Sequence, residues 1–339
     1  MVTHLQKEFM PLQALPSRRE LLIASAGLGL LPAWAQPSAW PSKTIRIVAA
    51  QAPGSSNDAT ARAYADFFSQ KLKAQVVVDN RPGGVGMIAA EIVAHAPPDG
   101  HTLLLTLQSQ PAQAPAMLKK PLIDPDKDLI PIASIGVGPV VAVVHKDFPV
   151  SNLAELIAYA KKKPVNVGNY AIGSGWQMML TQLSKDTGAQ FNVVNYKGTG
   201  AMLMDLYGGQ IDLGAGSLAG MGAGLQKGQV RPIVIIIGQR SAKVPGIPTW
   251  VEAGFRGPAY EDLAETNMLF APAGTPAAVI EQLAKLVQDS VTDSPKVRAV
   301  RETLSADDPP LVGAALNQFI ARSWPTYRRL TREMGIQAD

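Results

Sequence analysis

The residues best suited to hold a small molecule are small and polar, and they come directly before expected helix starts. The segment 51–58, Gln-Ala-Pro-Gly-Ser-Ser-Asn-Asp, leads from a strand straight into a helix. Its small residues leave backbone N–H groups free, and the N-terminus of a helix favours negative charge. The segment therefore predicts an anion site, although an ordinary turn with a Ser or Asn cap would show the same pattern. The candidate residues are Pro53, Gly54, Ser55, Ser56, Asn57 and Asp58.

Two segments in the second half of the chain combine flexible backbone, hydroxyl groups and a helix start in the same way. They are 171–175, Ala-Ile-Gly-Ser-Gly, and 195–200, Asn-Tyr-Lys-Gly-Thr-Gly. In open parallel sheets, ligands bind beyond the carboxyl ends of the strands, so we expect both sets of loops to face one cleft. Further candidate ligand-binding residues are Gly173, Ser174, Gly175, Trp176, Tyr196, Lys197, Gly198 and Thr199, together with Gln108 and Ser109.

Two of the larger side chains near these loops have two interpretations each. Trp176 either stacks on an aromatic carboxylate or packs behind its loop beside two methionines. Arg81, in the glycine-rich bend 80–86, either binds a carboxylate or pairs with Asp79 or Asp58, and the pairing is favoured.

The elements that must position these loops alternate between short β-branched runs and amphipathic stretches. The first half predicts strands at 44–49, 75–78 and 101–106, with helices at 58–71 and 87–95. This is a βαβαβ unit with a parallel sheet. The second half predicts strands near 140–144, 165, 192–195, 211–214 and 231–237, and helices at 153–162, from 177 and at 200–207. The chain then returns with a strand at 268–271 and a helix at 277–290.

Capping residues support several of these boundaries. Asn152 and Glu155 form a capping box. Thr275 is expected to cap a helix that has Pro276 at its first position. The pair 208–209, Gly-Gly, would close the preceding helix in a left-handed conformation.

Composition excludes several classes of function. The net charge of +4 is spread along the chain without a basic block, so a nucleic-acid partner is not expected. The absence of cysteine rules out disulfides and thiolate chemistry. The three histidines after residue 35 are isolated from one another in sequence, so no metal site and no cofactor are expected.

The first 35 residues have the features of a cleavable export signal. A charged start containing Arg18 and Arg19, an apolar run at 21–33 and an Ala-x-Ala site at 33–35 occur in the required order. The apolar run is shorter than the about 20 residues that span a bilayer. The paired arginines resemble the twin-arginine signal, and cleavage is expected after Ala35.

The chain after the leader resembles the Bug family, the periplasmic solute receptors of tripartite tricarboxylate transporters. The resemblance covers nearly this whole part of the chain and keeps the order of many short motifs. They are 40–46 (Trp-Pro-Ser-Lys-Thr-Ile-Arg), 52–54 (Ala-Pro-Gly) with Asp58, 80–83 (Asn-Arg-Pro-Gly), 98–104 (Pro-Asp-Gly-His-Thr-Leu-Leu), 196–198 (Tyr-Lys-Gly), 208–213 (Gly-Gly-Gln-Ile-Asp-Leu), 248–249 (Pro-Thr) with 252–254 (Glu-Ala-Gly), and 271–276 (Ala-Pro-Ala-Gly-Thr-Pro).

The resemblance implies an α/β, type II periplasmic-binding-protein fold, with two Rossmann-like lobes joined by two crossover strands. Lobe 1 is expected at 36–143 plus 268–339 and lobe 2 at 144–267. It also implies a monomeric, non-catalytic receptor in the periplasm of a Gram-negative bacterium. The receptor would hold a di- or tricarboxylate or an aromatic acid through backbone amides, hydroxyls and waters, and would pass it to the transporter's membrane subunits.

Three positions depart from the family pattern and leave the ligand open. Gly54-Ser55 stands where the family usually has two glycines, and Trp176 stands in a loop that is usually small and polar. Thr266 or a neighbour replaces an aromatic residue.

Two other functions remain as alternatives. One is a sensory receptor for a membrane histidine kinase. The other is an NAD-dependent oxidoreductase, suggested by Gly-x-Gly-x-x-Ala at 214–219 but lacking the acidic residue expected about 20 positions later. No G-x-S-x-G, H-E-x-x-H or Walker A motif supports another enzyme.

Overall fold

The computed structural model describes residues 40–135, 139–218, 220–237, 240–241, 244–261, 263, 265–304, 306 and 308–337. The expected export signal at 1–35 lies outside these residues. Residues from Trp40 onward form one compact unit. No described helix is long and apolar enough to cross a membrane.

The first sheet has six strands in the order β11-β4-β10-β3-β1-β2. They are β1 (Ile45–Ala49), β2 (Val76–Asn80), β3 (Thr102–Leu107), β4 (Leu129–Ser134), β10 (Asn267–Pro272) and β11 (Leu311–Val312). Strand β1 is parallel to β2 and β3, whereas β10 is antiparallel to β3 and β4. All six residues of β10 are buried, as expected for a strand covered on both faces.

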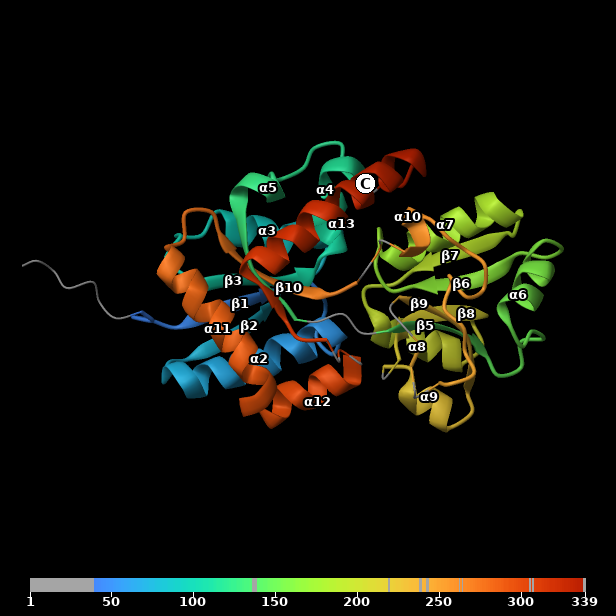
Figure 1. Ribbon diagram of the computed structural model, residues 1–339, viewed down its shortest axis with the longest axis horizontal. Coiled ribbons are helices and arrows are strands. Elements are labelled where there is room, and N and C mark those ends of the chain that lie inside the picture. Colours follow the sequence, from blue (N-terminus) through green and yellow to red (C-terminus); the bar gives the residue numbers. More distant parts are fainter. Residues whose placement is uncertain are drawn as a thin grey trace, which may run out of the picture. The chain divides into compact units, whose positions relative to one another are not determined.

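Helices cover both faces of this sheet. Helices α2 (Ser56–Leu72), α11 (Ala277–Asp293) and α12 (Pro295–Leu304) lie on one face, and α3 (Met87–Ala94), α4 (Ser109–Met117) and α13 (Gly313–Glu333) lie on the other (Figure 1). Two short elements, η1 (Gly84–Gly86) and α5 (Pro125–Asp128), occur in the connections. The first face packs Phe67 and Phe68 of α2 with Ile47, Leu283 and Val297.

The second sheet has five strands in the order β7-β6-β8-β5-β9. They are β5 (Val140–His145), β6 (Val165–Asn169), β7 (Phe191–Asn195), β8 (Leu213–Ser217) and β9 (Val230–Ile237). Strand β6 is parallel to β7 and β8, and β5 is antiparallel to β8 and β9. The helices of this part are α6 (Leu153–Ala160), α7 (Gly175–Thr187), α8 (Thr199–Tyr207), α9 (Gly222–Gln226) and α10 (Pro258–Glu261).

The chain passes from one sheet to the other twice, between β4 and β5 and between β9 and β10. All of β5 belongs to the second sheet, so the first crossing comes before Val140, whereas the sequence placed 140–143 with the first lobe. The return crossing ends at Asn267, where β10 begins, one residue before the expected boundary.

The capping predictions have mixed outcomes. Asn152 Oδ1 accepts from the Glu155 amide at 2.9 Å, which confirms the capping box. Gly209 adopts a φ of +70°, which confirms the left-handed end of α8. The prediction for Thr275 is wrong, because its hydroxyl donates to Pro272 O at 2.8 Å and Pro276 takes the cap position of α11.

Candidate functional site

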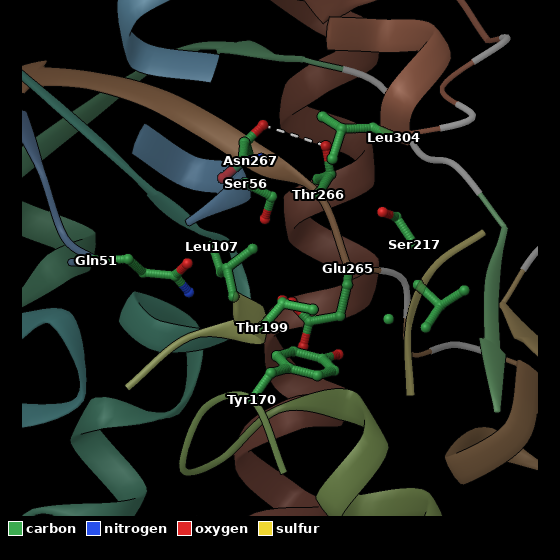
Figure 2. Close-up of a pocket in the computed structure, with 12 residues that line it drawn as sticks. Gln51, Ser56, Leu107, Tyr170, Thr199, Ser217, Glu265, Thr266, Asn267 and Leu304 are labelled. Carbon is green, nitrogen blue, oxygen red and sulfur yellow. Dashed lines mark hydrogen bonds between the residues drawn. The ribbon is translucent and has the colours of Figure 1, made fainter. Parts of the chain in front are cut away.

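A pocket of about 60 Å³, partly open to solvent, lies where the strand ends of both sheets meet (Figure 2). From the first sheet it takes residues at the ends of β1 and β3 and the start of α2. From the second it takes residues at the ends of β6 and β8 and the start of α8. Its lining residues are Gln51, Ser56, Leu107, Val140, Tyr170, Thr199, Gly216, Ser217, Glu265, Thr266, Asn267 and Leu304.

The loops before α2 and α8 lie against each other at this pocket. A Cβ added to Gly198 would be 3.5 Å from the Cβ of Ser55, which is van der Waals contact. Gly198 has a φ of +134°, a conformation that glycine adopts far more readily than other residues. The residues that follow, Ser56 and Thr199, are the first residues of their helices, and both line the pocket. The structure therefore brings together two loops that lie about half a chain apart in sequence.

Other residues of the first loop are engaged within the protein. The Asp58 carboxylate accepts from the Gly54 amide at 2.9 Å, and it also accepts from Arg62 and Asn80. Burial alone would raise the pKa of Asp58, but these hydrogen bonds outweigh it and hold the pKa below its usual range. Ser55 caps α2 by accepting from the Asp58 amide at 3.2 Å. Asp58 and the Gly54 amide therefore stabilise the helix start, and Pro53 and Gly54 are not among the lining residues.

The loop before α7 is likewise engaged within the protein. Ser174 Oγ caps α7 by accepting from the Gln177 amide and donates to Asn169 Oδ1. The Gly173 amide donates to Gln177 Oε1 at 2.7 Å, and the Gly175 amide donates to Glu265 Oε1 at 2.7 Å. This loop forms part of the wall that supports the pocket.

Trp176 packs behind the loop. Its side chain is 1% exposed, and its indole N–H donates to Gly168 O at 3.1 Å. The structure thus has the packed arrangement and not the stacking one.

Tyr196 and Lys197 line a neighbouring pocket of about 240 Å³ together with the glycine-rich bend at 82–86. The two pockets share Gln51 and Tyr170, so they adjoin. Tyr196 donates its hydroxyl to Asp205 Oδ2 at 2.6 Å. Burial, followed by this hydrogen bond and the negative charge of Asp205, raises the pKa of Tyr196 to about 12.

Arg81 pairs with Asp79, with 2.9 Å between Nε and Oδ1, as the favoured interpretation predicted. The remaining candidates lie behind the pocket lining. Asn57 Nδ2 donates to Asn267 Oδ1 at 2.8 Å, and Gln108 Oε1 accepts from Ser323 Oγ at 3.3 Å.

Glu265 is the lining residue that the sequence analysis missed and that most changes the electrostatics of the pocket. It is 8% exposed, and its Oε2 accepts from Ser109 Oγ at 3.1 Å. Burial raises the pKa of Glu265 to about 7, despite the hydrogen bonds from Gly175 and Ser109. None of the lining residues is a lysine or an arginine, so the described pocket surface has no cationic side chain to offset this carboxylate.

Other lining residues that were not predicted could have been found from their position in the sequence. Gln51, Leu107, Tyr170 and Ser217 lie at or just beyond the carboxyl ends of strands, which is the rule that pointed to the loops. Glu265 lies before a strand, so that rule does not find it.

The described residues do not support the dinucleotide alternative. Gly214 and Gly216 lie within strand β8 and not in a strand-to-helix turn, while Ala219 lies outside the described residues. In the described part of the chain, no group of three or more His, Asp or Glu residues is placed to hold a metal ion.

Comparisons with known proteins agree on one family. The model of the tripartite tricarboxylate transporter family receptor matches residues 60–336. A UPF0065 protein of Bordetella bronchiseptica is 33% identical over 277 residues, which is 81% of each chain. Members of this family are solute-binding receptors and not enzymes.

Solved structures show the same periplasmic-binding-protein fold with two mixed α/β sheets. Rpa4515 of R. palustris with adipate has a TM-score of 0.79 at 28% identity, covering 88% of this chain and 99% of that one. The periplasmic binding protein BugD has a TM-score of 0.78 at 28% identity, with coverages of 88% and 100%. MatC of Rhodopseudomonas palustris with bound malate has a TM-score of 0.71 at 29% identity, with coverages of 87% and 97%. The chain therefore belongs to the receptor family of the tripartite tricarboxylate transporters.

Proposed function

We propose that this chain captures a small organic carboxylate in the pocket between its two sheets and delivers it to the membrane subunits of a tripartite tricarboxylate transporter. The observation that carries the proposal is that Ser56 and Thr199 begin two helices from different parts of the chain and line one pocket. Two helix N-termini at one pocket favour an anion. The similar proteins with adipate and malate indicate the class of ligand.

Backbone and hydroxyl donors supply enough free energy for this without a cationic side chain. Micromolar binding requires about 8 kcal/mol. A hydrogen bond to a charged group contributes roughly 1.5–3 kcal/mol. A few donors around the carboxylate, together with the apolar contacts of Leu107, Val140 and Leu304, can therefore offset the cost of ordering the ligand and closing the two lobes as a monomer.

A substitution at Ser56 separates binding from folding. Ser56 is the first residue of α2, where proline is well tolerated, and the extended Ser55 before it (φ −74°, ψ 165°) suits a residue that precedes proline. Ser56→Pro removes one amide donor and one hydroxyl, whereas Ser56→Ala removes the hydroxyl alone.

The test is calorimetry with a panel of mono-, di- and tricarboxylates and aromatic acids. We expect binding by the wild type, a loss of about tenfold or more in Ser56→Pro from at least one missing charge-assisted hydrogen bond, and a smaller loss in Ser56→Ala. Equal affinities in all three proteins, with folding unchanged, would contradict the anion site.

We also propose that the chain acts in the periplasm after removal of residues 1–35. The order of charged, apolar and Ala-x-Ala segments supports export, and the paired arginines support the twin-arginine route. Mass spectrometry of protein from the periplasmic fraction should give an N-terminus at Gln36. Unchanged export of an Arg18→Lys, Arg19→Lys double variant would argue against the twin-arginine route.

A further inference from the structure

The carboxylate of Glu265 lies where a carboxylate group of a ligand could otherwise bind. Its Oε1 accepts from the Gly175 amide, and its Oε2 accepts from Ser109 Oγ. Gly175 begins α7 and Ser109 begins α4, so the carboxylate lies at the N-termini of two helices. Helix N-termini attract negative charge. At the loop before α7, where the sequence predicted contact with the ligand, the helix N-terminus therefore binds a carboxylate of the protein itself.

The pairing of β10 with β3 brings Glu265 to the start of α4. Strand β10 is antiparallel to β3, with Asn267 opposite Leu107, and the Gln108 amide donates to Thr266 O at 3.0 Å. Strand β3 ends at Leu107 and α4 begins at Ser109, so Glu265, two residues before β10, comes next to the start of α4. The Glu265 carboxylate accepts from Ser109 Oγ there.

The pocket has a second buried polar group beside Glu265. The phenol oxygen of Tyr170 is buried and makes no hydrogen bond of good geometry, although Ser174 and the Trp176 main chain lie close enough to interact with it. Tyr170 and Glu265 both line the pocket, and Figure 2 shows the phenol ring close to the Glu265 side chain. These neighbours leave the oxygen poorly satisfied, so it can also form a hydrogen bond to a ligand.

We propose that Glu265 makes this receptor select an acid with one carboxylate and, elsewhere on the molecule, a hydrogen-bond donor such as an ammonium or amide group, over a dicarboxylate of similar length. The inference rests on the proposed function, in which the helix starts at Ser56 and Thr199 hold the ligand's carboxylate. A second ligand carboxylate would face Glu265 with no cationic side chain among the described lining residues to separate the two charges. A donor would instead use the free acceptor capacity of Glu265 and the oxygen of Tyr170.

Calorimetry with matched ligand pairs tests the proposal near pH 8. The pairs are succinate and γ-aminobutyrate, glutarate and δ-aminovalerate, adipate and ε-aminocaproate, and terephthalate and its monoamide. We expect the wild type to prefer the donor-bearing member of at least one pair by about tenfold or more, which corresponds to about 1.4 kcal/mol. Glu265→Gln keeps the shape but loses the charge, so it should reverse or abolish that preference. Glu281→Gln, an exposed change on α11, should leave it intact.

The outcomes distinguish the two proposals. Tighter binding of dicarboxylates by the wild type, with the same ratio in Glu265→Gln, would overturn the role of Glu265 while leaving carboxylate capture in place. No binding of any of these acids, or of the wider carboxylate panel, by the folded wild type would overturn both.

Discussion

The buried Glu265 carboxyl should make the stability of the protein fall as pH rises. In the unfolded chain this group ionises near the ordinary pKa of 4.5, whereas burial raises its pKa to about 7 in the folded protein. Between these values the folded state holds a proton that the unfolded state has lost. The stability that this group contributes is therefore fully present below pH 4.5, decreases as pH rises toward 7, and changes little above that value.

The size of the effect follows from the two pKa values. Their difference corresponds to about 3 kcal/mol in the free energy of unfolding. About 2 kcal/mol of this is lost between about pH 5.5 and about pH 8.5. Tyr170 and Tyr327 also face Glu265, but burial, with the Glu265 charge next, raises the pKa of both well above 10, so neither titrates in this range.

Urea denaturation at the two pH values measures the effect without any ligand. The wild type and the control Glu281→Gln should both lose about 2 kcal/mol more than Glu265→Gln over this range. Identical pH dependence in all three proteins would refute the reasoning, because it would mean that Glu265 ionises in the folded protein as readily as it does in the unfolded chain.

Three further changes have defined outcomes. Trp176→Phe should lower the free energy of unfolding by about 1–3 kcal/mol, because Gly168 O loses its donor, while calorimetry shows unchanged ligand affinity. Arg301→Met should cost about 3 kcal/mol or more in urea denaturation, because the buried guanidinium donates to three main-chain carbonyls, those of Ile135, Ala306 and Asp308. Asp58→Asn should reduce the loss of stability on acidification. The lowered pKa of Asp58 in the folded protein contributes stability that is present above pH 3.8 and is lost as pH falls through that folded-state pKa. Circular dichroism during acid titration measures this loss.

Local patterns predicted most of the parallel strands and the helices that follow them. The structure confirms β1, β3 and α11 to within a few residues of the expected boundaries. Three of the longer elements that the sequence did not reveal contain prolines. Strand β4 includes Pro131, α4 includes Pro111 and Pro115, and α13 includes Pro325. Packing stabilises these elements where local preference does not, since α13 lies against α4 and β4.

The loops of the candidate site could be located because they follow strands, but the contacts of their residues could not. The same glycine and serine pattern gives lining residues at Ser56 and Thr199 and helix caps at Ser55 and Ser174. Which role each residue takes depends on neighbours that are distant in sequence. Glu265 illustrates this most clearly, because its partners Gly175 and Ser109 begin two different helices and lie 90 and 156 residues away in sequence.

The position of β10 in the first sheet has a consequence for folding during synthesis on the ribosome. Strand β10 fills the gap between β3 and β4, yet it is translated only after the entire second sheet. Until then, β3 and β4 each have an edge without a neighbour, and open edges invite aggregation. The nascent chain should consequently depend on chaperones until about residue 272 emerges, and truncated versions ending before β10 should accumulate as insoluble material.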